Sequence, residues 1–179
     1  PRYRSSAASD VYKRQGLGTP VVSFTNGELA TLQGFTLTGG EGYLEETESS
    51  YACTSITTCT DYYDTYAGGG IYIEGADPTI YDIIIEGIAL PEASSIASGD
   101  DTYHVNSYGG AIYVGNGTLS AERFAIIDNF ADQGGGIYVD ADSIFTGTSA
   151  WVIANVAVDG AGMQVDGGEA ILTNIASLW

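Results

Sequence analysis

Basic residues are scarce in this chain, and their scarcity excludes whole classes of partner. Five lysines and arginines face 23 acidic residues, which gives a formal net charge of −18. Four of the five precede residue 15, so Arg123 is the only lysine or arginine in the rest of the chain. A body this acidic repels phosphate backbones and anionic membranes. We therefore expect no nucleic-acid partner, whereas cations, basic proteins and neutral glycans stay open.

Helical patterning is also lacking. No extended stretch carries apolar residues at positions i, i+3, i+4 and i+7. Apolar and β-branched runs of three to six residues alternate instead with clusters of Gly, Asp and Asn, which is typical of short strands and tight turns. Long apolar runs are absent too, so we expect no direct membrane insertion by this segment. The sequence predicts an all-β fold.

The first fifteen residues read as foreign to the protein. Ser5 to Gln15 have the sequence SSAASDVYKRQ, which is one reading frame of a common transposase sequencing adapter. We expect residues 1–15 to be an adapter-derived, disordered segment and leave them out of fold reasoning. The remainder has 22 acidic residues against Arg123, a formal charge of −21. Because the sequence ends within a repeat, we expect residues 16–179 to be an incomplete domain.

A glycine-rich phrase recurs along the chain and sets its period. Its copies are GGGIYI from Gly68, GGAIYV from Gly109, GGGIYV from Gly134 and GAGMQV from Gly160. Ile112 and Ile137 are 25 residues apart, and Met163 follows 26 residues later. Ile71 lies 41 residues before Ile112, which equals one repeat plus an insertion of about 16. Repeats of this length that bury their apolar faces against their neighbours build a solenoid.

Strand alternation assigns the faces of each repeat. The isoleucines of the phrase and Met163 form an inward column. The residue that follows each member of this column should point outward, and these residues should stack along the surface: Tyr72, Tyr113, Tyr138 and Gln164. A second apolar run follows in each repeat: residues 83–85, 124–127, 151–153 and 170–172. Two polar, aperiodic insertions, at about 41–67 and 90–108, are expected to be loops.

Asparagines follow three of these apolar runs, at Asn129, Asn155 and Asn174. Asn tolerates left-handed turn geometry and bonds to nearby backbone. Stacked from repeat to repeat, the three amides can form a hydrogen-bonded ladder that satisfies otherwise buried polar groups. We predict a structural role for them.

The Gly-Gly-Ala/Gly-Ile-Tyr phrase, with its Asn-x-Ala turn, resembles the right-handed parallel β-helix repeats of bacterial secreted proteins. It is similar to the polymorphic outer-membrane-protein repeat, which pairs Gly-Gly-Ala-Ile with Phe-x-x-Asn, and to secreted pectate-lyase-like β-helix proteins. Here Phe124 and Asn129 stand further apart than in that motif. The resemblance covers about Leu29–Trp179 outside the insertions. It implies a right-handed parallel β-helix with coils of about 25 residues, and many chemistries use that scaffold.

Two cysteines lie close together in the first insertion, at Cys53 and Cys59. A disulfide between them would pin a long loop and would place the protein in an oxidising compartment. Free thiols or two ligands of a metal site are the alternatives. We predict the disulfide, and with it an extracellular or outer cell-surface location.

Acidic residues supply the candidate metal and catalytic sites. Asp140 and Asp166 follow the phrase in successive repeats, about 5 Å apart along the stack, where calcium could bridge them. Solvated turn acids are the plainer reading. Asp100 and Asp101 lie near the only histidine, His104. Parallel β-helix hydrolases use Asp pairs, but this group is expected to be a solvated loop.

The preferred functional hypothesis is an adhesin-like or structural binding scaffold that is secreted or attached to a cell surface, with no turnover by this segment. Tyr72, Tyr113 and Tyr138 are its candidate contacts with a glycan or protein surface, unless their role is packing alone. The alternative is part of a carbohydrate-active enzyme, a polysaccharide lyase or glycoside hydrolase. Carboxylates that converge in a groove beside Arg123 or His104 would favour the enzyme.

Overall fold

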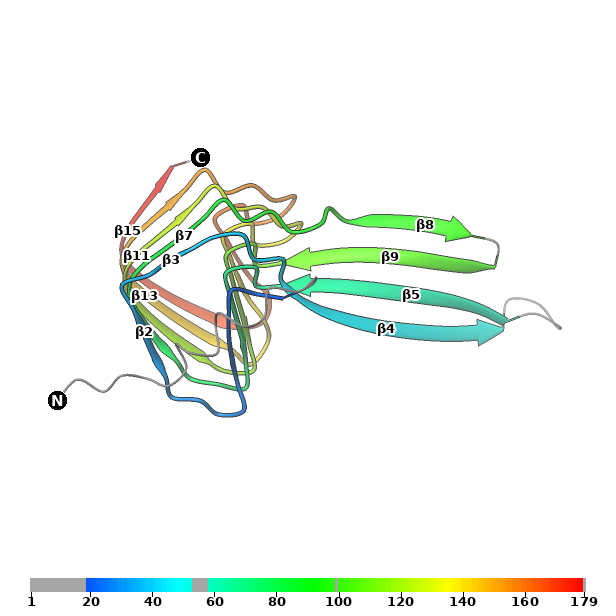
Figure 1. Ribbon diagram of the computed structural model, residues 1–179, viewed down its shortest axis with the longest axis horizontal. Helices are drawn as coiled ribbons and strands as arrows, with labels where there is room; N and C mark the ends of the chain where they lie inside the picture. Colours follow the sequence, from blue (N-terminus) through cyan, green and yellow to red (C-terminus); the bar gives the residue numbers. More distant parts are fainter. Residues whose placement is uncertain (1–18, 53–57, 99, 179) are drawn as a thin grey trace.

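The structure, a computed structural model, describes residues 19–52, 58–98 and 100–178. Every regular element in these ranges is a β-strand, and the strands form three sheets (Figure 1). The all-β class is therefore confirmed. No helix in the same ranges is long and apolar enough to cross a membrane. The adapter-like segment 1–15 lies outside the described residues.

The first sheet contains the glycine-rich phrases. Its strands, in spatial order, are β1 (Val22–Thr25), β6 (Ile71–Glu74), β10 (Ile112–Gly115), β12 (Ile137–Val139) and β14 (Met163–Val165). All pair in parallel, and Ile71, Ile112, Ile137 and Met163 are partners in register, as predicted. Strand β1 was not predicted, because no glycine phrase precedes it. Its Val22 nevertheless pairs with Ile71.

The first glycine of each phrase is needed for its backbone conformation. The φ angles of Gly68, Gly109, Gly134 and Gly160 lie between 60° and 64°. Residues with a Cβ rarely adopt this left-handed region. A Cβ at Gly134 would also collide with the carbonyl oxygen of Ile137. The recurring glycine is therefore a requirement of the turn that enters each strand of the first sheet.

The second sheet takes the chain onward from each strand of the first. Its strands are β2 (Thr31–Gln33), β3 (Thr36–Leu37), β7 (Thr79–Glu86), β11 (Thr118–Ile127), β13 (Ile144–Ile153) and β15 (Glu169–Leu178). The order is β15-β13-β11-β7-β2, with β3 also paired to β7. Apolar side chains of both sheets fill one core, in which Ile80, Ile112 and Ile126 are fully buried. Each repeat thus buries its apolar face against its neighbours.

The last repeat does not align as predicted. Residues 170–172 pair with Phe145–Gly147 in β13, whereas Trp151 pairs with Ala176. Each long strand of the second sheet contains two runs of apolar residues. The sequence analysis aligned the first run of β15, residues 170–172, with the second run of β13, residues 151–153. The gap in the register places Asn174 beside Ser149, and both have left-handed φ angles, of 55° and 56°.

The two insertions are strands, not irregular loops. The first forms a hairpin of β4 (Tyr43–Ala52) and β5 (Thr58–Ala67), and the second a hairpin of β8 (Ser94–Ser98) and β9 (Asp101–Tyr108). Parallel pairing of β5 with β9 joins them into a four-stranded sheet that projects from the body (Figure 1). The prediction of loops was wrong because β4 and β8 are mostly exposed and β5 and β9 are mostly half-buried, so these strands show little apolar alternation.

A buried carboxylate fastens the projecting sheet to the body. Asp132 is 8% exposed and accepts hydrogen bonds from the backbone N–H of Ala93 (2.8 Å) and of Ser107 (3.1 Å). The Ser107 hydroxyl also donates to Asp132 (2.8 Å) and accepts from its backbone N–H (2.9 Å). Asp132 therefore holds both ends of the second hairpin. Sequence analysis did not single it out.

Candidate functional site

A column of tyrosines runs along the first sheet at the base of the projecting sheet. The ring centroids of Tyr72 and Tyr113 are 5.4 Å apart, and those of Tyr113 and Tyr138 are 5.8 Å apart. Tyr43, from the projecting sheet, stacks on Tyr72 at 4.5 Å. Near-parallel rings at these spacings attract one another. The rings stack as predicted, but Tyr72 and Tyr138 are buried, at 9% and 4% exposure, and are not surface residues.

The hydroxyls of this column bond to acids one repeat further along. Tyr113 donates to Asp140 (2.8 Å), and Tyr138 donates to Asp166 (3.0 Å). Burial, followed by the carboxylate that each hydroxyl faces, raises the pKa of both phenols well above the ordinary value. The tyrosines are therefore protonated donors at neutral pH. We call this series of bonds the tyrosine–acid ladder.

Calcium was predicted to bind between Asp140 and Asp166, and the described residues place no third acidic, His or Cys ligand with them. Each carboxylate accepts a tyrosine hydroxyl, and Asp140 also accepts the backbone N–H of Ala141 at 2.7 Å. Among the described residues, no group of three or more His, Cys, Asp or Glu side chains is arranged to hold a metal. Calcium binding stays a prediction.

The ladder has a gap at Gly115. This residue occupies the position in β10 that Asp140 and Asp166 occupy in the next two repeats. The Tyr72 hydroxyl consequently has no acid to bond and makes no hydrogen bond to a described residue. The carboxylate of Glu74 lies in the space that a side chain at position 115 would need.

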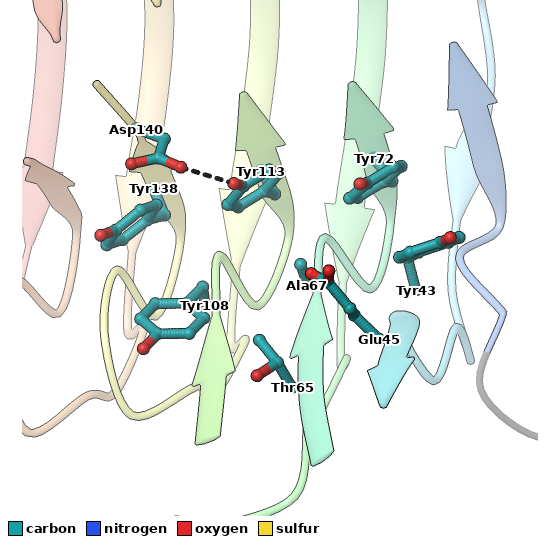
Figure 2. A pocket seen from close by; sticks show the side chains of 9 residues that line it. All are labelled: Tyr43, Glu45, Thr65, Ala67, Tyr72, Tyr108, Tyr113, Tyr138 and Asp140. Carbon is teal, nitrogen blue, oxygen red and sulfur yellow. Dashed lines mark hydrogen bonds between the residues drawn. The ribbon is translucent and has the colours of Figure 1, made fainter. Parts of the chain in front are cut away.

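A pocket of about 300 Å³ opens where the projecting sheet meets the tyrosine column (Figure 2). Its lining residues are Tyr43, Glu45, Thr65, Ala67, Tyr72, Tyr108, Tyr113, Tyr138 and Asp140. The volume is at the small end of the range for ligand sites. Both faces of the Tyr72 and Tyr113 rings are covered by neighbouring rings, so these residues offer a ligand their edges and hydroxyls.

Negative charge gathers at this pocket. Burial raises the pKa of Glu74, and the nearby carboxylates of Asp140 and Glu45 raise it further. Arg123 is remote from them in β11, where its guanidinium bonds Asp82 (2.6 Å) and also Glu122. That pairing holds the pKa of Asp82 at about 2, because the hydrogen bond from Arg123 favours the carboxylate. No lysine or arginine of the described ranges therefore balances the pocket.

The structure does not assemble the predicted catalytic group. Asp100 lies in an exposed turn, and Asp101 begins β9, where it accepts the backbone N–H of Thr60 at 3.1 Å. His104 stacks on Tyr63, with centroids 4.7 Å apart. Because side chains alternate along a strand, Asp101 and His104 point to opposite faces of the projecting sheet. Asp101 and His104 therefore cannot act together on one substrate.

Two of the three asparagines interact directly. Asn129 donates from Nδ2 to Asn155 Oδ1 (3.0 Å) and to the carbonyl of Ile85 (3.2 Å), and it accepts the N–H of Ile88 (3.1 Å). Asn174 is exposed at the bend of β15 and lies outside this pair. The predicted disulfide stays a prediction, since Cys53 lies outside the described residues. Cys59 is buried in β5 opposite Tyr51.

Sequence analysis missed five of the nine residues that line the pocket. Tyr43, Glu45, Thr65, Ala67 and Tyr108 all belong to the insertions, whose position over the tyrosine column depends on the pairing of β5 with β9. The only signal was the tyrosine content of the insertions. Comparison with protein-family models, curated proteins and solved structures gives no match.

Proposed function

We propose that residues 16–179 belong to a secreted or cell-surface protein and form a right-handed parallel β-helix that acts as an adhesin-like binding scaffold. The parallel register of successive glycine phrases supports the architecture. The resemblance to bacterial secreted repeats and the predicted Cys53–Cys59 disulfide support the location. The rigid stack would hold the projecting sheet away from the surface to which the protein is attached.

We further propose that this scaffold binds a glycan at the pocket between the projecting sheet and the tyrosine column. The observation that carries the proposal is the pocket itself, which combines aromatic edges with hydroxyl and carboxylate groups. Sugar rings present C–H groups that can pack on the ring of Tyr108 and against the ring edges of the column, and hydroxyls that donate to carboxylates or accept from phenols. Tyr108, tilted by 59° against Tyr138, adds a wall that is not parallel to the column. A neutral or cationic sugar suits this lining, because an anionic one would be repelled.

The test is a titration of the full chain with a panel of oligosaccharides, followed by calorimetry on those that bind. Tyr108→Ala should weaken binding about tenfold, equivalent to about 1.4 kcal/mol. Tyr62→Ala is the matched control, because Tyr62 stacks on Tyr103 on the opposite face of the projecting sheet. Failure of every oligosaccharide to bind, or equal losses in the two variants, would overturn the proposal.

A second candidate, hydrolysis of the bound glycan, is favoured by the two carboxylates that line the pocket, Glu45 and Asp140. Glycoside hydrolases use a pair of carboxyl groups on either side of the scissile bond. The convergence expected for an enzyme is thus partly met, although Arg123 and His104 are not at the pocket. Release of shorter sugars from a bound oligosaccharide, abolished by Glu45→Gln, would establish it. Binding without release of shorter sugars would favour the binding scaffold over the enzyme.

A further inference from the structure

The gap in the tyrosine–acid ladder leaves one donor unused inside the pocket. Tyr72 is 9% exposed and lines the pocket, and its hydroxyl makes no hydrogen bond to a described residue. The Tyr72 hydroxyl stays accessible from the pocket, since Gln164 Oε1 is the only side-chain polar atom of the described residues that is buried without a hydrogen-bond partner. The hydroxyls of Tyr113 and Tyr138 instead donate to Asp140 and Asp166. A ligand that accepts a hydrogen bond from Tyr72 would therefore take the place of the carboxylate that is missing at Gly115.

Two carboxylates near Tyr72 have no hydrogen-bond donor as a partner among the described residues. Glu45 lines the pocket, and Glu74 lies beside it in the space over Gly115. Neither carboxylate has a hydrogen bond or an ion pair within the described part of the chain. Asp140 contributes a third negative charge. Burial raises the pKa of Glu74, and the nearby carboxylates of Asp140 and Glu45 raise it further.

The two observations together define the ligand. Glu45 and Glu74 can accept from a positively charged donor, and the Tyr72 hydroxyl can donate to an acceptor next to it. A lysine ammonium has three donors and no acceptor, and a metal ion has no acceptor either. A sugar with a free amino group carries an ammonium and neighbouring hydroxyl oxygens on one small ring.

We propose that the pocket selects a glycan containing amino sugars with free amino groups, whose ammonium meets Glu45, Glu74 and Asp140 and whose hydroxyl accepts from Tyr72. This inference rests on the proposed glycan binding and names its specificity. Acetylation of the amino group would remove the charge and add bulk, so the acetylated sugar is expected to bind poorly.

The experiment is calorimetric titration of the full chain with three tetrasaccharides of the same linkage: glucosamine, N-acetylglucosamine and glucose. At about pH 6, the glucosamine tetramer should bind at least tenfold more tightly than the other two. Glu45→Gln should reduce that preference about fivefold. Glu46→Gln is the matched control, since it removes the same charge one residue away, on the opposite face of β4. Tyr72→Phe should weaken the binding of each tetrasaccharide that binds to the unmodified chain, without changing the order of their affinities.

Each other outcome has a definite meaning. If the neutral tetramer binds as tightly as the glucosamine tetramer, glycan binding stands and the amino-sugar inference is wrong. If none of the three binds, both the inference and glycan binding at this pocket lose support. Tighter binding of a lysine peptide, or of calcium alone with loss after Glu45→Gln, would likewise overturn the inference. Circular dichroism of each variant separates loss of binding from loss of folding.

Discussion

The hydroxyl of Tyr113 donates a 2.8 Å hydrogen bond to Asp140, which lies one repeat further along the first sheet. The same relationship joins Tyr138 to Asp166. Each bond crosses from one strand to its neighbour on the outer face, so the ladder reinforces the backbone pairing between repeats. The repeat in which Gly115 replaces the acid is the one at which the pocket opens.

Tyr113→Phe should therefore destabilise the fold by about 1–2 kcal/mol. The substitution keeps the ring in its stack and removes only the donor, so Asp140 loses a partner in a partly buried setting. Urea denaturation at neutral pH measures the change. Tyr103→Phe is the control, because Tyr103 is a half-exposed residue of the projecting sheet. Equal effects of the two substitutions would show that the ladder adds nothing.

Glu74→Gln should stabilise the protein at pH 7 and have little effect at about pH 4. Burial and neighbouring acids raise the pKa of Glu74 above its ordinary value of 4.5 in the folded state. A group with a raised folded pKa contributes stability below its unfolded pKa and loses it as pH rises through the folded value. The neutral Gln avoids this loss. Denaturation curves of both proteins at the two pH values test the prediction, and a benefit that is larger at the acidic pH would contradict it.

Asp132→Ala should loosen the projecting sheet without unfolding the body. The substitution leaves the buried N–H of Ser107, and that of Ala93, without an acceptor. Hydrogen exchange should become faster at these amides and along β9, and should stay slow at Ile112 and Ile137 in the first sheet. Asp132→Asn, which retains one oxygen acceptor, should give a smaller effect. Unchanged exchange in β9 would mean that strand pairing alone holds the sheet in place.

Asn129→Ala should cost about 3 kcal/mol, because it deprives the N–H of Ile88 and the carbonyl of Ile85 of their partners in the core. Asn174→Ala should cost much less, since Asn174 is exposed at the bend of β15. Thermal unfolding of the two variants compares them directly. Similar losses would be evidence that Asn174 belongs to the same ladder after all.

The repeat was predictable because its signals are local. The left-handed glycine that begins each phrase and the Ile-Tyr alternation after it depend on neighbouring residues, so the strands and their register could be derived for Ile71, Ile112, Ile137 and Met163. In β15 the local signal was ambiguous. Two apolar groups compete for the same alignment, and only pairing with β13 shows that Ala170 lies opposite Phe145.

The sequence by itself determined the all-β class, the period, the acidic surface and the outward direction of the tyrosines. Only the tertiary structure decided that those tyrosines are covered, that Tyr72 lacks the acid its neighbours have, and that Glu45 and Tyr108 join them around a pocket. The physical reason is the range of the interactions. Turn geometry and alternation act over a few residues, whereas the pocket depends on β5 pairing with β9, strands about 40 residues apart in sequence.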